Sequence, residues 1–243
     1  TTATVTEAGT ATLTVDLSAA SGKDITIDYA VQAASTATGS GTDYTLSNGT
    51  KTISAGATSV TISVPTASDA LDEDNETVVI LLSNPSNASL EDANKQLTLT
   101  ITDDDPTPSV QFNATSANYA EETASHNIRV DLSAVSGRDV SVAYTVAAGS
   151  PAATGSGTDY TLEDGTATIS AGSSNTNIVL TNVNDTMDEW NEKFVVTLSN
   201  SPTNATTGSN NVHTGTIVDN DALPTIDFSS ATSSVVENVT PKV

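Results

Sequence analysis

Apolar and polar residues alternate with a period of two over most of the chain, which is the pattern of half-buried β-strands. Turn signals such as Ser21-Gly22, Asn48-Gly49 and Ala55-Gly56 separate the alternating runs. No long stretch has a helical period. We therefore predict an all-β fold of short antiparallel strands. The clearest runs are Leu13, Val15 and Leu17, then Ile25, Ile27, Tyr29 and Val31, then Val60, Ile62 and Val64.

The pattern occurs twice, because the chain contains an internal repeat with an offset of 115 to 116 residues. Val15-Asp-Leu-Ser-Ala-Ala-Ser-Gly-Lys-Asp24 recurs as Val130-Asp-Leu-Ser-Ala-Val-Ser-Gly-Arg-Asp139. Gly39-Ser-Gly-Thr-Asp-Tyr-Thr-Leu46 recurs as Gly155-Ser-Gly-Thr-Asp-Tyr-Thr-Leu162. Turn spacing and alternation in each unit are typical of a β-sandwich.

The repeat predicts three segments joined by very short linkers. Residues 1–105 form a unit that lacks its first strand, residues 106–221 form a complete unit, and residues 222–243 are the opening strand of a further unit or a donor strand. The starts Pro108-Ser-Val-Gln-Phe112 and Pro224-Thr-Ile-Asp-Phe228 match each other.

The composition limits the classes of partner that the chain can bind. Seven Lys and Arg stand against thirty Asp and Glu, a formal net charge of −23, and this argues against binding nucleic acid or anionic lipid. Solubility is the other explanation of so many acidic residues.

The absence of Cys excludes disulfides and thiolate metal sites. No apolar run is long enough for a transmembrane helix, and the N-terminus has no signal-peptide pattern, so we expect a piece of a secreted or processed protein, or a cytosolic one.

Acidic residues concentrate just before one strand of each unit. Asp69-Ala-Leu-Asp-Glu-Asp-Asn-Glu76 has five carboxylates in eight residues and precedes the apolar run Val78–Leu82. Its copy is Asp185-Thr-Met-Asp-Glu-Trp-Asn-Glu192. Such a density of like charge needs a cation or open water, so a metal site and a hydrated acidic rim are the two interpretations.

The order of these motifs resembles that of the Calx-beta domain family. The motifs are Gly-x-Gly-Thr-Asp-Tyr, Ile-Ser-Ala-Gly, the acidic loop, Leu-Ser-Asn, and a closing acidic triplet at Asp103–Asp105 and at Asp219-Asn-Asp221. The resemblance covers both units and the start of the third. It implies tandem immunoglobulin-like β-sandwiches with calcium, Ca²⁺, bound at the end where the last strand finishes.

The resemblance also implies the ligands. For the first site they are Glu7, Asp43, Asp69, Glu73, Glu76, Asp103, Asp104 and Asp105. For the second they are Glu122, Asp159, Asp185, Glu189, Glu192, Asp219 and Asp221. Ser68 and Asn184 stand where a family member can have a further Asp, and Asn220 replaces the middle carboxylate of the second triplet. We expect the second site to bind fewer ions or to bind more weakly.

The donor chemistry agrees with calcium, which takes six to eight oxygen ligands in flexible geometry. Zinc or copper would need His or Cys, and we expect His126 and His213 to be exposed strand residues. Paired carboxylates also occur in glycosidases, but these loops lack aromatic platforms, and no nucleophile and base are paired, so we expect no enzyme. Trp190 either covers the second site or contacts a partner.

We expect a structural, adhesive role: calcium-stiffened sandwiches in an extracellular bacterial surface protein or filament, with calcium rigidifying the junctions. A regulatory calcium-sensor domain pair of a larger protein is the alternative. The partners would be neighbouring repeats or identical subunits, without nucleic acid and without direct membrane insertion. A strand at 224–232 would complete the first unit of another copy, head to tail. The competing explanation is a piece of a longer repeat array.

Overall fold

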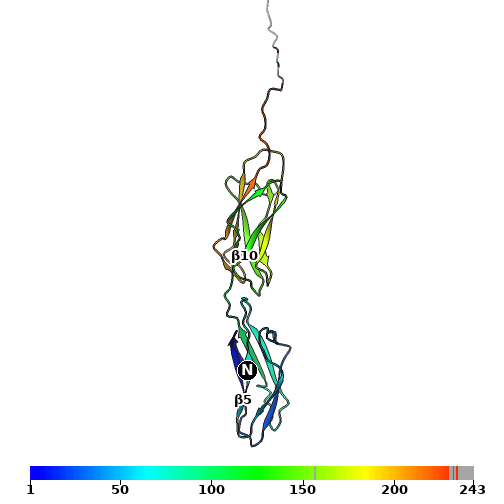
Figure 1. Cartoon of the computed structure of the whole chain (residues 1–243), viewed down its shortest axis with the longest axis vertical. Helices are drawn as coiled ribbons and strands as arrows, with labels where there is room; N and C mark the ends of the chain where they lie inside the picture. Colours follow the sequence, from blue (N-terminus) through cyan, green and yellow to red (C-terminus); the bar gives the residue numbers. More distant parts are fainter. Residues whose placement is uncertain (156, 230–231, 233, 235–243) are drawn as a thin grey trace, which may run out of the picture.

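The chain folds into two β-sandwiches stacked end to end, as the computed structural model shows (Figure 1). It describes residues 1–155, 157–229, 232 and 234. Within these residues every regular element is a strand, and none is a helix of the length and apolarity needed to cross a bilayer. The predicted all-β fold is confirmed.

The first sandwich, blue to green in Figure 1, pairs a large sheet with a small one. The large sheet has the order β1 (Thr2–Thr6), β7 (Gln96–Thr102), β6 (Glu76–Ser83), β3 (Ile25–Val31) and β4 (Gly49–Ile53). The small sheet contains β2 (Thr10–Asp16) and β5 (Ser59–Pro65). Each strand contributes alternate side chains to the core.

The second sandwich has two larger sheets. One has the order β12 (Tyr160–Thr161), β14 (Asn175–Asn182), β10 (Ser125–Leu132), β8 (Ser109–Phe112) and β16 (Thr206–Thr207). The other has the order β13 (Gly165–Ile169), β11 (Val140–Ala148), β15 (Glu192–Leu198), β17 (Val212–Val218) and β9 (Ser116–Ala120). The first sandwich has a counterpart of β9, namely β1, but the described chain provides no counterpart of β8.

The sequence pattern had suggested antiparallel strand pairs only, but some of the strand pairs are parallel. β1 pairs with β7, β9 with β17, and β8 with β16 in parallel. The reason is that the chain leaves one sheet after β8 and enters the opposite sheet as β9, where it runs in the same direction as β17. The parallel pair brings the ends of two strands to the same edge of the sandwich, and this edge is the acidic one.

The two cores differ in size. The second encloses the rings of Phe112 and Phe194, both fully buried. The core of the first contains Val64, Val78 and Leu99, each with no exposed surface. One expectation was wrong here: His213 is buried, with 3% of its surface exposed, because it faces inward from β17. Its ring nitrogens lie 2.8 Å from the Tyr119 hydroxyl and 2.7 Å from the Ala114 carbonyl oxygen.

Residues 224–229, part of the strand expected to bind another copy at 224–232, pair with no strand of the described chain. Residues 230–231, 233 and 235–243, which belong to the same predicted segment 222–243, lie outside the described residues. Residues 222–229 extend from the far end of the second sandwich, away from the first (Figure 1). Their apolar side chains are exposed, Leu223 at 80%, Ile226 at 99% and Phe228 at 94%.

Candidate metal centre

Three segments that are distant in sequence bring acidic residues to one end of the first sandwich. Glu7 follows β1, the loop Asp69–Glu76 joins β5 to β6, and Asp103–Asp105 follow β7. Since β1 and β7 are parallel neighbours, the residues after them emerge at the same edge. Carboxylate oxygens of Glu7, Asp104 and Asp105 lie within 4.8 Å of one another. The end of the first sandwich therefore holds a cluster of charge.

Hydrogen bonds within the chain hold this cluster in place. The backbone N–H of Asp69 donates to the Glu7 carboxylate. The backbone N–H of Asp103 donates to Oδ1 of Asn75, at 3.1 Å. Asp43 approaches from the loop after β3, where its Oδ2 accepts the N–H of Thr38 at 2.5 Å. Three of the contributing loops are thus tied to each other or to their own strands before any cation binds.

The carboxylates repel one another, and their pKa values record it. Burial and a hydrogen bond with Asp43 raise the pKa of Glu76 to about 7. Burial, followed by the charge of Asp69, raises the pKa of Glu73. The pKa of Glu7 is raised mainly by burial, and that of Asp105 by desolvation and then by Asp103. Burial is the largest cause of these shifts, and the neighbouring carboxylates add to it; a cation in this place would favour the ionised forms.

The second sandwich repeats the cluster, but with one residue different from our expectation. Oxygens of Glu121, Asp185 and Asp221 lie within 4.8 Å of one another, and the N–H of Asp185 donates to Oε1 of Glu121 at 3.1 Å. Glu121 is buried, with 5% exposed, whereas Glu122 is exposed. Glu121, not Glu122, therefore occupies the place that Glu7 has in the first sandwich.

Strand register explains the correction. Thr6 pairs with Thr102, and Ala120 pairs with Val218, so the residue after each pair is Glu7 in one unit and Glu121 in the other. The turn after this glutamate, between β1 and β2 or between β9 and β10, is one residue longer in the second unit. The repeat offset is therefore 114 before the turn and 115 after it. An offset taken from the motifs after the turn pairs Glu7 with Glu122 instead of Glu121.

The electrostatics of the second cluster follow those of the first. Burial and a hydrogen bond with Asp159 raise the pKa of Glu192 to about 7. Burial also raises the pKa of Glu121, and the charge of Asp219 adds to it. The pKa values of Glu189 and Asp221 are raised as well, first by desolvation. The other expected residues of both clusters are thus near enough to act on one another.

Several buried carboxylate oxygens are suitable ligands for a cation. In the described chain they have no hydrogen-bond partner, which is rare for buried polar atoms. A cavity of about 10 Å³, the space of one water-sized sphere, lies between Glu121, Asp159 and Glu192, and the exposed Trp190 helps to line it. Hard oxygen donors in this number suit calcium. The unpartnered oxygens are Oε2 of Glu7, Oδ1 of Asp103, Oδ2 of Asp105, Oδ1 of Asp219 and Oδ2 of Asp221.

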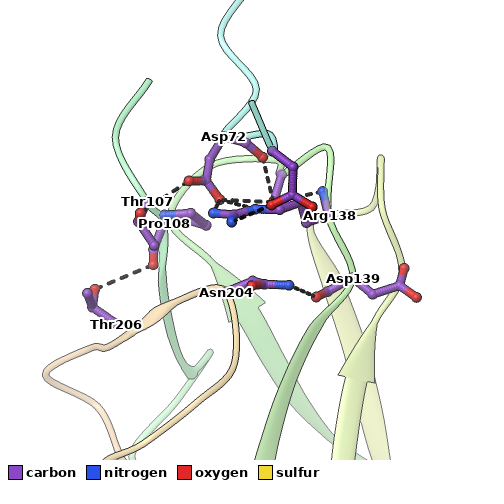
Figure 2. A network of polar contacts seen from close by, with 9 residues as sticks. Asp72, Thr107, Pro108, Arg138, Asp139, Asn204 and Thr206 are labelled. Carbon is purple, nitrogen blue, oxygen red and sulfur yellow. Dashed lines mark hydrogen bonds and ion pairs between the residues drawn. The ribbon is translucent and has the colours of Figure 1, made fainter. Parts of the chain in front are cut away.

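One acidic residue that the ligand set left out has a different position. Asp72 is buried, with 3% exposed, and it contacts the second sandwich (Figure 2). Nη2 and Nε of Arg138 donate to its Oδ2 at 2.5 and 3.2 Å, and Thr107 donates to its Oδ1 at 3.1 Å. Its backbone oxygen accepts from the N–H of Gly137 and from the Ser136 hydroxyl, both at 3.1 Å.

The contact between the two sandwiches was not predicted, although Asp72 and Arg138 both belong to the repeated motifs. Nη1 of Arg138 also donates to Oδ1 of the exposed Asp74, at 3.1 Å. The same loop, Asp69–Glu76, therefore supplies carboxylates to the cluster and a buried ion pair to the junction. The only sequence signal was the change from Lys23 to Arg138 between repeats, since Arg can bind one carboxylate through two nitrogens.

Comparison with known proteins gives one family. The family model described as Calx-beta domain matches residues 1–105 and residues 103–222. No curated protein matches the chain.

Solved structures with a similar arrangement include CBD12 from CALX1.2, at 20% identity and a TM-score of 0.41, covering 89% of this chain and 96% of that one. The calcium binding domain CBD12 of CALX1.1 gives 18% identity and 0.41, covering 89% and 97%. The apo-form Calx CBD1 domain gives 20% identity and 0.43, covering 48% and 100%.

Proposed function

The chain belongs to the Calx-beta domain family, and from this premise we propose that it is a calcium-binding structural repeat of an extracellular bacterial surface protein or filament, in which calcium stiffens the junction between sandwiches. Calx-beta domains are calcium-binding β-sandwich modules. The role as an adhesive stalk, the location and the effect of calcium on stiffness belong to our proposal.

One observation carries the proposal: the acidic loop of the first sandwich serves the cluster and the junction together. The charges of Asp69 and other members of the cluster raise the pKa of Glu73, after burial, and Asp72, which lies between Asp69 and Glu73 in sequence, binds Arg138. Without a cation, the repulsion within the cluster works against a fixed loop. Calcium would hold the loop in one conformation and so present Asp72 to Arg138 in a fixed geometry.

The two clusters would differ in affinity. Asp104 belongs to the first cluster, and Asn220 has its place in the second triplet. Calcium affinity rises with the number of charged ligands, so the first site, next to the junction, would bind more strongly. The second cluster lies at the end of the second sandwich that faces away from the first (Figure 1).

Small-angle scattering with calcium and with a chelator tests the proposal, together with calorimetry for the number of ions bound. We expect a narrower distribution of inter-domain distances with calcium. Equal profiles in the two conditions would contradict the stiffening role. Micromolar affinity with a large change of shape would instead support a regulatory calcium sensor. The Arg138→Met variant is the matched control, because it keeps the cluster and loses the junction.

A further inference from the structure

In each sandwich an early strand lies beside the last strand, and the two run in the same direction. β1 pairs with β7 along its whole length, from Thr2 opposite Thr98 to Thr6 opposite Thr102. β9 and β17 pair in the same way in the second sandwich. Because the two strands of a pair are parallel, the beginning of the early strand and the end of the last strand lie at opposite ends of the pair.

This arrangement decides how a stretching force acts on a sandwich. Tension along the chain pulls the beginning of β9 in one direction and the end of β17 in the other, so the two strands are sheared past each other. The strands of both sandwiches run roughly along the long axis of the molecule (Figure 1). The hydrogen bonds of a parallel pair are evenly spaced along the strands, so shear loads all of them together instead of one after another.

Backbone hydrogen bonds continue to both ends of the pair of β9 and β17. The N–H of Thr214 donates to the Thr115 oxygen at 2.9 Å, just before β9 begins. The N–H of Glu121 donates to the Val218 oxygen at 3.1 Å, just after β9 ends. The pair of β1 and β7 has the same two terminal bonds, at 3.0 and 3.2 Å. Shear therefore has to break the terminal bonds together with the ladder between them.

His213 joins β17 to the β9 segment a second time, through its side chain. Its Nδ1 lies 2.7 Å from the carbonyl oxygen of Ala114, which can only accept, so Nδ1 holds the proton and Nε2 accepts from the Tyr119 hydroxyl at 2.8 Å. Both side chains are buried, so breaking these bonds leaves polar atoms without water. The first sandwich has the apolar Leu97 and Val5 at the corresponding positions.

The acidic clusters lie at the place where the two parallel strands end. Glu121 directly follows β9, and Asp221 belongs to the triplet that follows β17. Their carboxylate oxygens, with one of Asp185, lie within 4.8 Å of one another. A cation bound to them would connect the two strands that tension shears apart. Without a cation, like charges at the same place favour their separation.

We propose that each sandwich is a force-bearing unit, in which the parallel strand pair resists tension along the chain and calcium at the end of the pair raises this resistance. The inference rests on the proposed calcium binding and adds a second effect of the ion. Besides stiffening the junction, calcium keeps a sandwich folded under load. In the second sandwich the side-chain bonds of His213 contribute to the same resistance.

Single-molecule force spectroscopy on the full chain tests the proposal. The sequence has no Cys, so two introduced cysteines define the direction of pulling. Thr115→Cys with Ala222→Cys loads β9 and β17 in shear. Thr115→Cys with Val212→Cys separates the same strands from one end, so that their bonds break in succession. All three positions are exposed. With calcium, we expect the unfolding force in shear to be roughly twofold higher or more at the same pulling speed.

The contribution of calcium is measured in the same two pulling directions. A chelator should lower the unfolding force in shear and leave the force for separation from the Val212 end unchanged, because the cluster lies at the other end of the pair. Glu121→Gln should give the calcium-free value even with calcium present. Glu122→Gln is the matched control and should keep the effect of calcium, since Glu122 is exposed beside the cluster.

The side-chain bonds of His213 have an equally small test. Tyr119→Phe removes only the hydroxyl that donates to Nε2 of His213. We expect the unfolding rate at constant shear force to rise roughly fivefold, because one buried hydrogen bond across the sheared pair is lost. Tyr144→Phe is the control, since β11 borders neither β9 nor β17.

Three outcomes overturn the inference. The first is an equal unfolding force in the two pulling directions, and the second is a shear force that does not fall when calcium is removed. The third is an equal loss of the calcium effect in Glu121→Gln and Glu122→Gln. Calorimetry on the same samples separates the two proposals, because calcium binding without a change in unfolding force contradicts the force-bearing role and leaves the proposed function intact.

Discussion

Arg138 binds the carboxylate of Asp72 across the boundary between the two sandwiches, with Nη2 and Oδ2 2.5 Å apart, and only 3% of the Asp72 side chain is exposed. Removing one partner of such a pair leaves a charge in a place without water, at a cost of about 3 to 5 kcal/mol. Separation of the two sandwiches would return Asp72 to water without unfolding either one. We therefore expect the pair to affect the angle between the sandwiches more than their stability.

Replacing Arg138 tests this directly. We expect Arg138→Met to widen the distribution of inter-domain distances in small-angle scattering, while each sandwich keeps its melting temperature within a few degrees, because the unpaired Asp72 is hydrated when the boundary opens. Lys95→Met is the control, since Lys95 pairs with the exposed Asp92 far from the boundary. A large loss of thermal stability without added flexibility would contradict the interpretation.

Two glycines offer a matched pair at equivalent turns. Gly137→Ala should disturb the junction, because the added Cβ would lie 2.5 Å from a carboxylate oxygen of Glu73 and 2.6 Å from its Cγ. Gly22→Ala should change nothing in the isolated chain, because its Cβ has open space. Scattering and limited proteolysis of the linker around Pro106 are the measurements. If the two variants behave equally, the close contact between Gly137 and Glu73 is not required for the junction.

The closing triplets predict unequal calcium affinities. Asp104→Asn should weaken the first site, and Asn220→Asp should strengthen the second, each on the order of tenfold, because the number of charged ligands changes by one. Calorimetry with calcium measures both. Asn210→Asp, which adds a charge on the surface away from the cluster, separates a ligand effect from a general effect of net charge. No change with Asn220→Asp would mean that residue 220 does not reach the ion.

The corrected glutamate can be tested in the same way. Glu121→Gln should weaken calcium binding at the second site, because Glu121 is buried within 4.8 Å of Asp185 and Asp221. Glu122→Gln, its exposed neighbour, is the control and should leave the affinity unchanged. The reverse result would restore the correspondence that the sequence suggested.

The raised pKa values predict how the calcium-free chain depends on pH. Glu76 and Glu192 have a pKa of about 7 in the folded chain, above the ordinary value of 4.5. Between these two values the folded state binds more protons than the unfolded state, so the free energy of unfolding should fall as the pH rises through the window. Melting temperatures of calcium-depleted protein at about pH 5 and about pH 8 should therefore be higher at the lower pH.

Two further measurements check the source of that slope. Glu76→Gln and Glu192→Gln should flatten it, because neither side chain then titrates. With excess calcium the order should reverse, since calcium competes with protons for the same oxygens. A melting temperature that rises with pH in calcium-depleted protein would contradict the raised pKa values of Glu76 and Glu192.

The repeat and the alternation of side chains were sufficient to predict two all-β units, since a period of two places Val64 and Leu99 on inward faces whatever the topology. The resemblance to the Calx-beta family also implied that Asp69, Asp105 and their copies gather at one end. The parallel pairs β1–β7 and β9–β17 were not predictable in this way, because alternation does not record the direction of a neighbouring strand. His213 shows the same limit: its polar character suggested an exposed position, but its place on β17 decided its burial.

By itself, then, the sequence determined the number of units, the fold class and the chemistry of the acidic end, because all three depend on residue types and on their spacing along the chain. Only the tertiary structure decided that Glu121 and not Glu122 joins the cluster, since one additional residue in a turn is absorbed without changing the motifs around it. It also decided that Asp72 leaves the cluster for Arg138. Contacts between residues that are 66 positions apart depend on how two folded units meet, and no local pattern of side chains contains that information.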